Sequence, residues 1–272
     1  MSAQAIDLRA LGLDVRRRII ECSKRAHVGH IGSCLSVADI LAALYGRILR
    51  RDAADPNERD RLILSKGHAA LALYAVLHAV GRLDESELDR FCADGSPLGT
   101  HPEHAVEGID FSTGSLGQGL SFGAGAAIAA RLQGSSRRSF VVLSDAELNE
   151  GSVWEAAAFA GHHRLDKLAA IVDVNGQQAF GYTREVLDPG SLPERWRTVG
   201  WQVSEVDGED PEAIADALAS PAAAAAPQVV LAHTVFGSGV PFMESKLEWH
   251  YLPMNDAEYE IAQAALESRR EA

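Results

Sequence analysis

Asp145 and Asn175 are the residues whose types and spacing best suit metal binding. Asp145 lies in SDAELNEG (144–151), at the end of the apolar run 140–144, and Asn175 lies in VDVNGQ (172–177), at the end of the run 168–174. One strand–helix–strand unit spans about this separation, so both side chains are expected at the carboxyl ends of neighbouring parallel strands, where open sheets bind ligands. Their oxygens, with nearby carbonyls, suit Mg²⁺, and Mg²⁺ suits a diphosphate. Taken alone, an Asp and an Asn at strand ends are more often turn residues.

Four histidines form a second candidate group. They are His30 in GHIGS, His68 in SKGHAALALY, His101 in GTHPE and His250 in EWHY. A lone histidine is usually a core or surface residue, but each of these lies in a glycine-rich or turn segment, where loops hold functional groups. Imidazoles donate or accept protons near neutral pH, which suits contact with a polar substrate. His27, three residues before His30, is interpreted as structural.

The glycine-rich segment STGSLGQGLSFGAG (112–125) is a third signal. Its glycines permit close approach of the backbone to a ligand and tight helix packing. Such loops are common, so the segment is weak evidence when taken alone.

The elements that must position these residues alternate along the chain. Short apolar runs at 140–144, 168–174, 201–206 and 228–235 are typical of buried strands. Helices are expected over 4–26, 36–49 with Ser36 as N-cap, from SKGH to about 80, 152–165 and 210–218. This alternation predicts an α/β fold with a parallel sheet and helices on both faces. The alanine-rich stretch 222–226 either extends a helix or forms a joint, and the flanking Pro221 and Pro227 favour a joint.

Composition narrows the class of protein. The chain has 272 residues, of which 47% are hydrophobic, and a formal net charge of -13, which argues against nonspecific nucleic-acid binding. Three widely spaced cysteines exclude a disulfide framework and a CxxC metal site. The charged N-terminus predicts no signal peptide, and no apolar window of about 18 residues is expected to span a membrane. We therefore expect a cytoplasmic protein with one domain over 1–272, including an N-terminal helix (about 1–25) and a mobile C-terminal tail (about 236–272).

The segments around Asp145 and Asn175 resemble the thiamine-diphosphate-binding motif, which begins Gly-Asp-Gly and ends near an Asn about thirty residues later. The likeness extends through ELNEGSVWEAAAFAGHHRLDKL to DVNGQQAFG and is similar to transketolases of the split, two-gene kind. With GHIGS, SKGH, THPE and TGSLGQG in order, it covers roughly residues 20 to 252. It implies the diphosphate-binding domain of that fold, with thiamine diphosphate and Mg²⁺ as cofactors.

The resemblance also implies a role for each matching residue. Asp145, the side chain of Asn175 and the carbonyl of Gln177 would bind Mg²⁺, and the N–H of Ala146 would reach a phosphate oxygen. The backbone near Gly114 and Leu116 would contact the aminopyrimidine ring. His30 and His101 would contact a ketose donor, while His68 and His250 would lie between the diphosphate and the substrate channel. Glu150 and Glu155 would lie near the cofactor at a subunit interface, although both types are also common on solvated helices.

The sequence departs from the family pattern at three places. Gly-Asp-Gly is replaced by Ser144-Asp145-Ala146, Gly-Lys-Gly by Gly237-Ser238-Gly239, and Trp-His-Gly by Trp249-His250-Tyr251. Ala146 fits with little strain if its φ is negative, and costs roughly 1 kcal/mol if its φ is positive. Ser238 removes a cation, and Tyr251 places a ring near the channel. These changes predict a divergent member with an unusual acceptor or reduced activity.

The implied reaction is transfer of a two-carbon ketol unit from a ketose to an aldehyde. The chain lacks room for the pyrimidine-binding domain, so a C-terminal transketolase subunit would supply the activating glutamate, in a two-plus-two heterotetramer that acts on sugars or sugar phosphates. One alternative is a subunit of a two-chain 2-oxo acid decarboxylase or dehydrogenase, and another is a non-catalytic scaffold. A nicotinamide-binding oxidoreductase is disfavoured because no GxGxxG opens a helix after the first strand.

Overall fold

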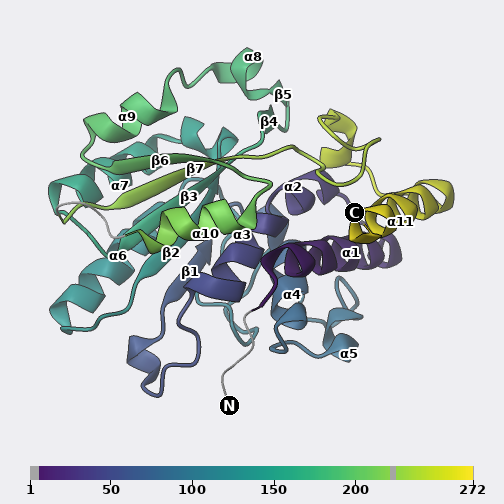
Figure 1. Cartoon of the computed structure of the whole chain (residues 1–272), viewed down its shortest axis with the longest axis horizontal. Coiled ribbons are helices and arrows are strands. Elements are labelled where there is room, and N and C mark those ends of the chain that lie inside the picture. Colours follow the sequence, from purple (N-terminus) through teal and green to yellow (C-terminus); the bar gives the residue numbers. More distant parts are fainter. Residues whose placement is uncertain (1–5, 221–224, 272) are drawn as a thin grey trace.

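A five-stranded parallel sheet forms the centre of the molecule. The computed structural model describes residues 6–220 and 225–271, and its main sheet has the strand order β1-β2-β3-β7-β6 (Figure 1). The strands are β1 (Arg61–Leu64), β2 (Ser139–Ser144), β3 (Leu168–Val174), β6 (Gln202–Asp207) and β7 (Gln228–His233). A separate hairpin contains β4 (Gln177–Gln178) and β5 (Gly181–Tyr182). The α/β fold with a parallel sheet, predicted from the alternating apolar runs, is confirmed.

The two faces of the sheet belong to different hydrophobic cores. Along β2, Phe140 and Val142 pack into one core, while Val141 and Leu143 pack into the other. Successive side chains of a strand point to opposite faces, so a continuous apolar run is needed when both faces are covered. This explains why the strands carry almost no polar residues until their carboxyl ends.

Helices cover both faces (Figure 1). The larger core holds α1 (Leu8–Ala26), α2 (Ile31–Ser36), α3 (Ala38–Ala43), α4 (Ala70–Ala79), α10 (Pro211–Ala219) and α11 (Asp256–Glu271). The smaller core holds α6 (Gly119–Leu132), α7 (Gly151–His162) and α9 (Leu192–Thr198). Short elements complete the chain: η1 (Leu44–Ile48), η2 (Pro56–Glu58), η3 (Gly67–Ala69), α5 (Glu85–Leu88), η4 (Ala146–Asn149), α8 (Thr183–Leu187) and η5 (Leu247–His250).

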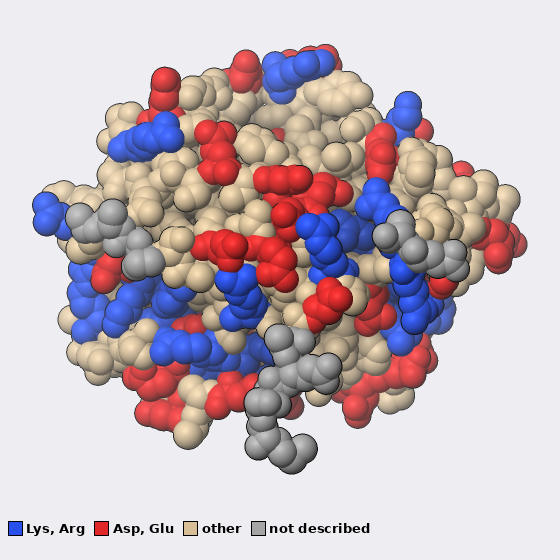
Figure 2. All heavy atoms as spheres, in the orientation of Figure 1, with Lys and Arg blue, Asp and Glu red and all other residues tan. Residues whose placement is uncertain are grey.

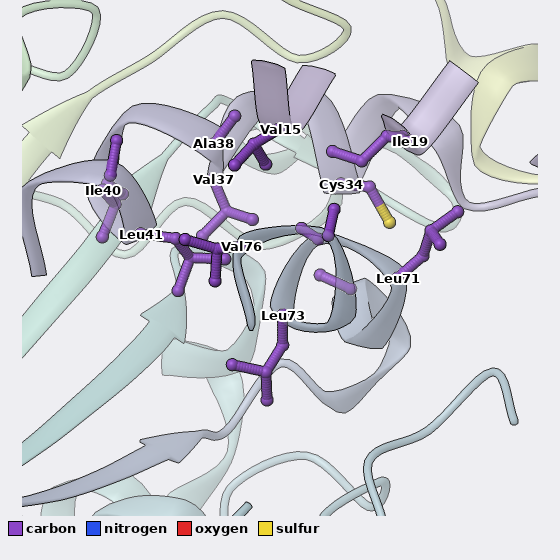
Figure 3. Close-up of a cluster of buried hydrophobic side chains, with 14 of the residues drawn as sticks. Val15, Ile19, Cys34, Val37, Ala38, Ile40, Leu41, Leu71, Leu73 and Val76 are labelled. Carbon is purple, nitrogen blue, oxygen red and sulfur yellow. The ribbon is translucent and has the colours of Figure 1, made fainter. Parts of the chain in front are cut away.

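Figure 3 shows the larger core, where Val15 and Ile19 of α1 lie near Cys34, Val37 and the aliphatic residues of α3 and α4. Most of these side chains are fully buried. Each large aliphatic side chain buried in this way contributes about 1.5–3 kcal/mol. The core therefore holds the loops before α2 and α4, which carry two of the candidate histidines, on a rigid base.

Several predicted boundaries differ from the structure. Helix α2 already begins at Ile31, and Ser36 lies inside it rather than capping a later helix, because its hydroxyl donates to the buried carboxylate of Asp173. The second half of the glycine-rich segment is helical, as α6 begins at Gly119. The C-terminal segment, expected to be a mobile tail, packs on the core through residues such as Phe236 and Leu266. Residues 4–5 of the first helix and 221–224 of the alanine-rich stretch lie outside the described residues.

One stretch passes a length-and-composition test for crossing a membrane, contrary to the sequence expectation. It is Ile31–Ile48, and 83% of it is buried inside the structure, as in the core helices of globular proteins. On the surface in Figure 2, Lys and Arg are interspersed with Asp and Glu, so that face carries no uniform basic stripe for nucleic acid.

Candidate functional site

A cavity of about 160 Å³ lies at the carboxyl ends of the central strands. Nine of the predicted site residues line it: His30, His68, His101, Gly114, Leu116, Ala146, Asn175, Gln177 and His250. Sequence reasoning did not select the remaining lining residues, which are Ser33, Ser144, Gln178, Ala179 and Phe236. Segments that are far apart in the chain therefore meet at one place.

We call Ser144, Asp145, Ala146 and Asn175 the acidic wall. Strands β2 and β3 pair in register with Ser144 opposite Asp173, which brings the next residues of each strand together. The carboxylate of Asp145 accepts hydrogen bonds from the N–H of Ala146 (2.9 Å) and Gly176 (2.9 Å). The hydroxyl of Thr183 donates to the same carboxylate at 3.1 Å. The predicted meeting of the two strand ends is therefore present, with Asp145 buried just behind the cavity lining.

The chemistry of this wall suits a hard divalent cation. Burial, and then the charge of Asp173, raises the pKa of Asp145 to about 6, and a nearby cation would oppose both effects. In residues 6–220 and 225–271, no three His, Cys, Asp or Glu side chains are grouped as a metal site. A metal here would therefore be held by one carboxylate, an amide oxygen and a carbonyl, a donor set that fits Mg²⁺ bound to a diphosphate.

Ala146 is free of backbone strain. It begins η4, and it is absent from the described non-glycine residues with positive φ. The negative-φ alternative therefore holds, and the replacement of glycine by alanine costs little at this position.

We call His30, His68, His101 and His250 the histidine wall. The rings of His30, His68 and His250 lie together, with centroid separations of 5.3 to 5.7 Å. Burial lowers the pKa of His30, and burial followed by the charge of Lys66 lowers the pKa of His68 well below its usual value. Burial and the neighbouring His30 lower the pKa of His250 to about 4. All three imidazoles are therefore neutral near pH 7.

The histidine wall leaves polar atoms unpaired. The Nε2 atom of His68 bonds the hydroxyl of Ser33 at 2.9 Å. The Nδ1 atoms of His30 and His250 are buried, and neither has a hydrogen-bond partner in the described part of the chain. Buried polar atoms are normally paired, so unpaired ones facing a cavity indicate a ligand that completes them.

The glycine-rich loop is held against the site by a buried carboxylate that sequence reasoning missed. Glu147 accepts hydrogen bonds from the hydroxyl of Ser65 and from the N–H of Gly117, the latter at 2.7 Å. Burial raises the pKa of Glu147. Gly114 lies so close to His101 that a Cβ atom there would stand 3.3 Å from its ring. These contacts fix Gly114 and Leu116 in the cavity lining.

A buried ion pair supports both walls from behind. Lys66 and Asp173 are fully buried and bonded to each other. Asp173 accepts a hydrogen bond from the Nδ2 atom of Asn175 (3.1 Å), and Lys66 donates to the carbonyl of Ser33 (3.1 Å). The pair was not predicted, although Lys66 stands in the SKGH motif and Asp173 stands two residues before Asn175.

The other departures and the interface candidates lie outside the cavity lining. Ser238 is buried, accepts from Arg16 at 3.2 Å and donates to Glu209, so its hydroxyl belongs to a structural network. The hydroxyl of Tyr251 donates to the carbonyl of Ala179 in the β4–β5 hairpin. Glu150 and Glu155 are exposed on and before α7, and the structure does not bring either into the cavity.

Comparisons with known proteins agree with this geometry. The family described as "Transketolase, thiamine diphosphate binding domain" matches residues 6–269. The 6-deoxy-6-sulfo-D-fructose transketolase subunit SqwG of Clostridium sp. (strain MSTE9) is 39% identical over 98% of each chain. One of the subunits named for the apulose-4-phosphate transketolase of Phocaeicola vulgatus is 38% identical over 94% of this chain and 92% of the relative. The solved transketolase of Campylobacter jejuni superposes with a TM-score of 0.89 at 28% identity, over 98% of this chain and 43% of that chain.

Proposed function

The chain belongs to the transketolase family, whose thiamine-diphosphate-binding domain it carries, and we propose that it is the diphosphate-binding subunit of a two-chain transketolase that transfers a two-carbon ketol unit from a ketose to an aldehyde. One observation carries the proposal. A single cavity joins an acidic wall suited to a metal diphosphate with a wall of neutral imidazoles whose buried nitrogens lack partners. Neutral hydrogen-bonding groups suit a polyhydroxylated sugar.

The acidic wall would hold the cofactor. Asp145, the amide oxygen of Asn175 and the carbonyl of Gln177 would bind Mg²⁺, and Ala146 would offer its N–H to a phosphate oxygen. Gly114 and Leu116 would contact the aminopyrimidine ring through their backbone. Thiamine diphosphate, when bound, supplies the electron sink for cleavage of the carbon–carbon bond beside a ketose carbonyl.

The histidine wall would bind and orient the sugar. His30 and His101 would contact the hydroxyls and carbonyl of the ketose donor, and His68 and His250 would lie between the diphosphate and the donor. Because His30, His68 and His250 are neutral near pH 7, each can donate from one ring nitrogen and accept at the other. That capacity suits proton movement at a sugar hydroxyl.

A partner chain would complete the site. This chain spans 43% of the solved Campylobacter transketolase, and the relatives that match its whole length are named as subunits. The partner would supply the pyrimidine-binding domain and the activating glutamate, in a two-plus-two heterotetramer in which exposed Glu150 and Glu155 face the other chains. Three free thiols suit the reducing cytoplasm.

Titration calorimetry tests the cofactor assignment. Thiamine diphosphate is titrated, with and without Mg²⁺, into the chain alone and into its complex with the protein encoded by the adjacent gene. We expect Mg²⁺-dependent binding by the complex, and a loss of affinity of about 100-fold or more in Asp145→Ala, which removes the carboxylate ligand. Asp94→Ala, at an exposed aspartate far along the chain from the site, serves as the matched control and should bind as the wild type does. Binding that is independent of Mg²⁺, or unchanged in Asp145→Ala, would contradict the proposal.

A further inference from the structure

Gln178 is a buried side chain that the cofactor and histidine assignments leave unexplained. It is 8% exposed, it lines the cavity, and its Nε2 atom is buried with no hydrogen-bond partner among the residues described. A buried amide nitrogen without a partner is unfavourable, because water has been removed and nothing replaces it. Its position in the cavity wall indicates that a bound molecule provides the missing acceptor.

The cavity lining restricts the chemistry of that acceptor. None of the described residues that line the cavity is Asp, Glu, Lys or Arg. The nearest buried cation, Lys66, lies behind the lining and is already paired with Asp173. A neutral donor among neutral imidazoles suits an uncharged oxygen, such as a sugar hydroxyl or carbonyl, better than a phosphate.

Two tyrosines hold the hairpin that carries Gln178. The hydroxyl of Tyr251 donates to the carbonyl of Ala179, the next residue, and the hydroxyl of Tyr182 donates to the carbonyl of Ser245 at 3.3 Å. Tyr251 also packs on His250, with ring centroids 5.2 Å apart. The histidine wall and the hairpin are thereby joined through the residue that replaces the family's glycine, although Tyr251 itself is 54% exposed.

We propose that Gln178 is a substrate-binding residue, which donates its Nε2–H to a hydroxyl or carbonyl oxygen of the ketose donor, and that Tyr251 is a positioning residue that holds the hairpin for this contact. The inference rests on the proposed function and deepens it, because it names a group that reads the sugar. A hydrogen bond made equally to bound substrate and transition state changes KM and leaves kcat unchanged.

The test uses the two-chain complex and steady-state kinetics with a panel of ketoses of four to seven carbons. Gln178→Leu removes the amide while keeping a side chain of similar size, and we expect KM for the donor to rise about tenfold with kcat unchanged. Tyr251→Phe removes only the hydroxyl, and we expect a KM rise of about threefold. The double variant should be no worse than Gln178→Leu, because both changes act on one contact. Gln133→Leu, at an exposed glutamine that ends α6, is the matched control and should leave KM unchanged.

Each outcome separates the inference from the function on which it rests. If the wild-type complex cleaves a ketose and Gln178→Leu leaves KM unchanged, the substrate contact is overturned while the transketolase function stands. If Gln178→Leu weakens thiamine diphosphate binding in calorimetry, the amide serves the cofactor and the inference is also overturned. If additive KM changes appear in the double variant, the positioning role of Tyr251 is overturned. If the wild-type complex cleaves no ketose, the proposed function and the inference fail together.

Discussion

The two walls of the cavity differ in how completely the chain pairs their polar atoms. On the acidic wall, three donors from the chain itself already bond the carboxylate of Asp145. On the histidine wall, buried Nδ1 atoms of His30 and His250 have no partner within the described ranges. The difference indicates that the acidic wall is preformed by the sheet, whereas the histidine wall is completed by the molecule it binds.

The preformed wall follows from the order of the sheet. Strands β2 and β3 are neighbours, so the residues after Ser144 and Val174 must lie close together whatever ligand is present. The histidines come from four separate loops, and no single pair of strands fixes their spacing. Loops held on a rigid scaffold can carry unpaired groups that a continuous sheet does not tolerate.

The largest expected effect comes from the ion pair behind both walls. Lys66→Met leaves the buried carboxylate of Asp173 without its cation, and we expect a loss of about 3–5 kcal/mol in the free energy of unfolding. Since Lys66 also bonds the carbonyl of Ser33, the change should disturb both walls together. Denaturant unfolding of the purified complex measures the loss, and thiamine diphosphate calorimetry reports the acidic wall.

Lys167→Met is the graded control for this change. The amine of Lys167 donates to the carbonyl of Ser135 at 2.7 Å, and its loss is expected to cost about 1 kcal/mol. If Lys66→Met costs no more than Lys167→Met, the ion pair does not join the two walls, and their separate behaviour needs another explanation.

The comparison also explains what the sequence could and could not predict. Asp145 and Asn175 were found because continuous apolar runs mark buried strands, and parallel strands end at one edge of the sheet. Lys66 and Asp173 were missed because their pairing depends on how α2, η3 and β3 pack, which no local pattern records. Gln178 was missed for a similar reason, since a glutamine after a strand is ordinary until its amide is known to be buried. The prediction of Ser36 as an N-cap was wrong because its hydroxyl serves Asp173 rather than its own helix.

A smaller effect is expected from pH, and it should be confined to the histidine wall. The pKa of His250 is lowered to about 4, so the folded protein resists a proton that the unfolded chain accepts near pH 6.5. Its contribution to stability is therefore present above pH 6.5 and is lost as the pH falls towards 4. Solvent screens the half-buried ring, so the loss should stay below the about 1.4 kcal/mol per pH unit of one fully shielded proton.

Unfolding midpoints measured between pH 7.5 and 4 check this expectation. His250→Phe keeps a ring beside Phe236 but cannot be protonated, and its midpoint should fall less steeply below pH 6.5 than that of the wild type. His163→Phe, at an exposed histidine that ends α7, is the control and should retain the wild-type slope. Identical slopes in His250→Phe and the wild type would mean that His250 is not held neutral by the wall.

The smallest expected effect is at Ala146, where the acidic wall departs from the family's glycine. Because Ala146 begins a helical turn without positive φ, restoring glycine relieves no strain. Ala146→Gly should leave thiamine diphosphate affinity within about twofold and should lower stability by about 0.5–1 kcal/mol through added freedom of the unfolded chain. Gly176→Ala is the reversed control, because Gly176 has a φ of 74° and its N–H donates to Asp145, so a Cβ there should cost about 1–2 kcal/mol. A large gain in cofactor affinity from Ala146→Gly would show that the acidic wall is not preformed for the diphosphate, and the contrast between the two walls would then fail at its firmer side.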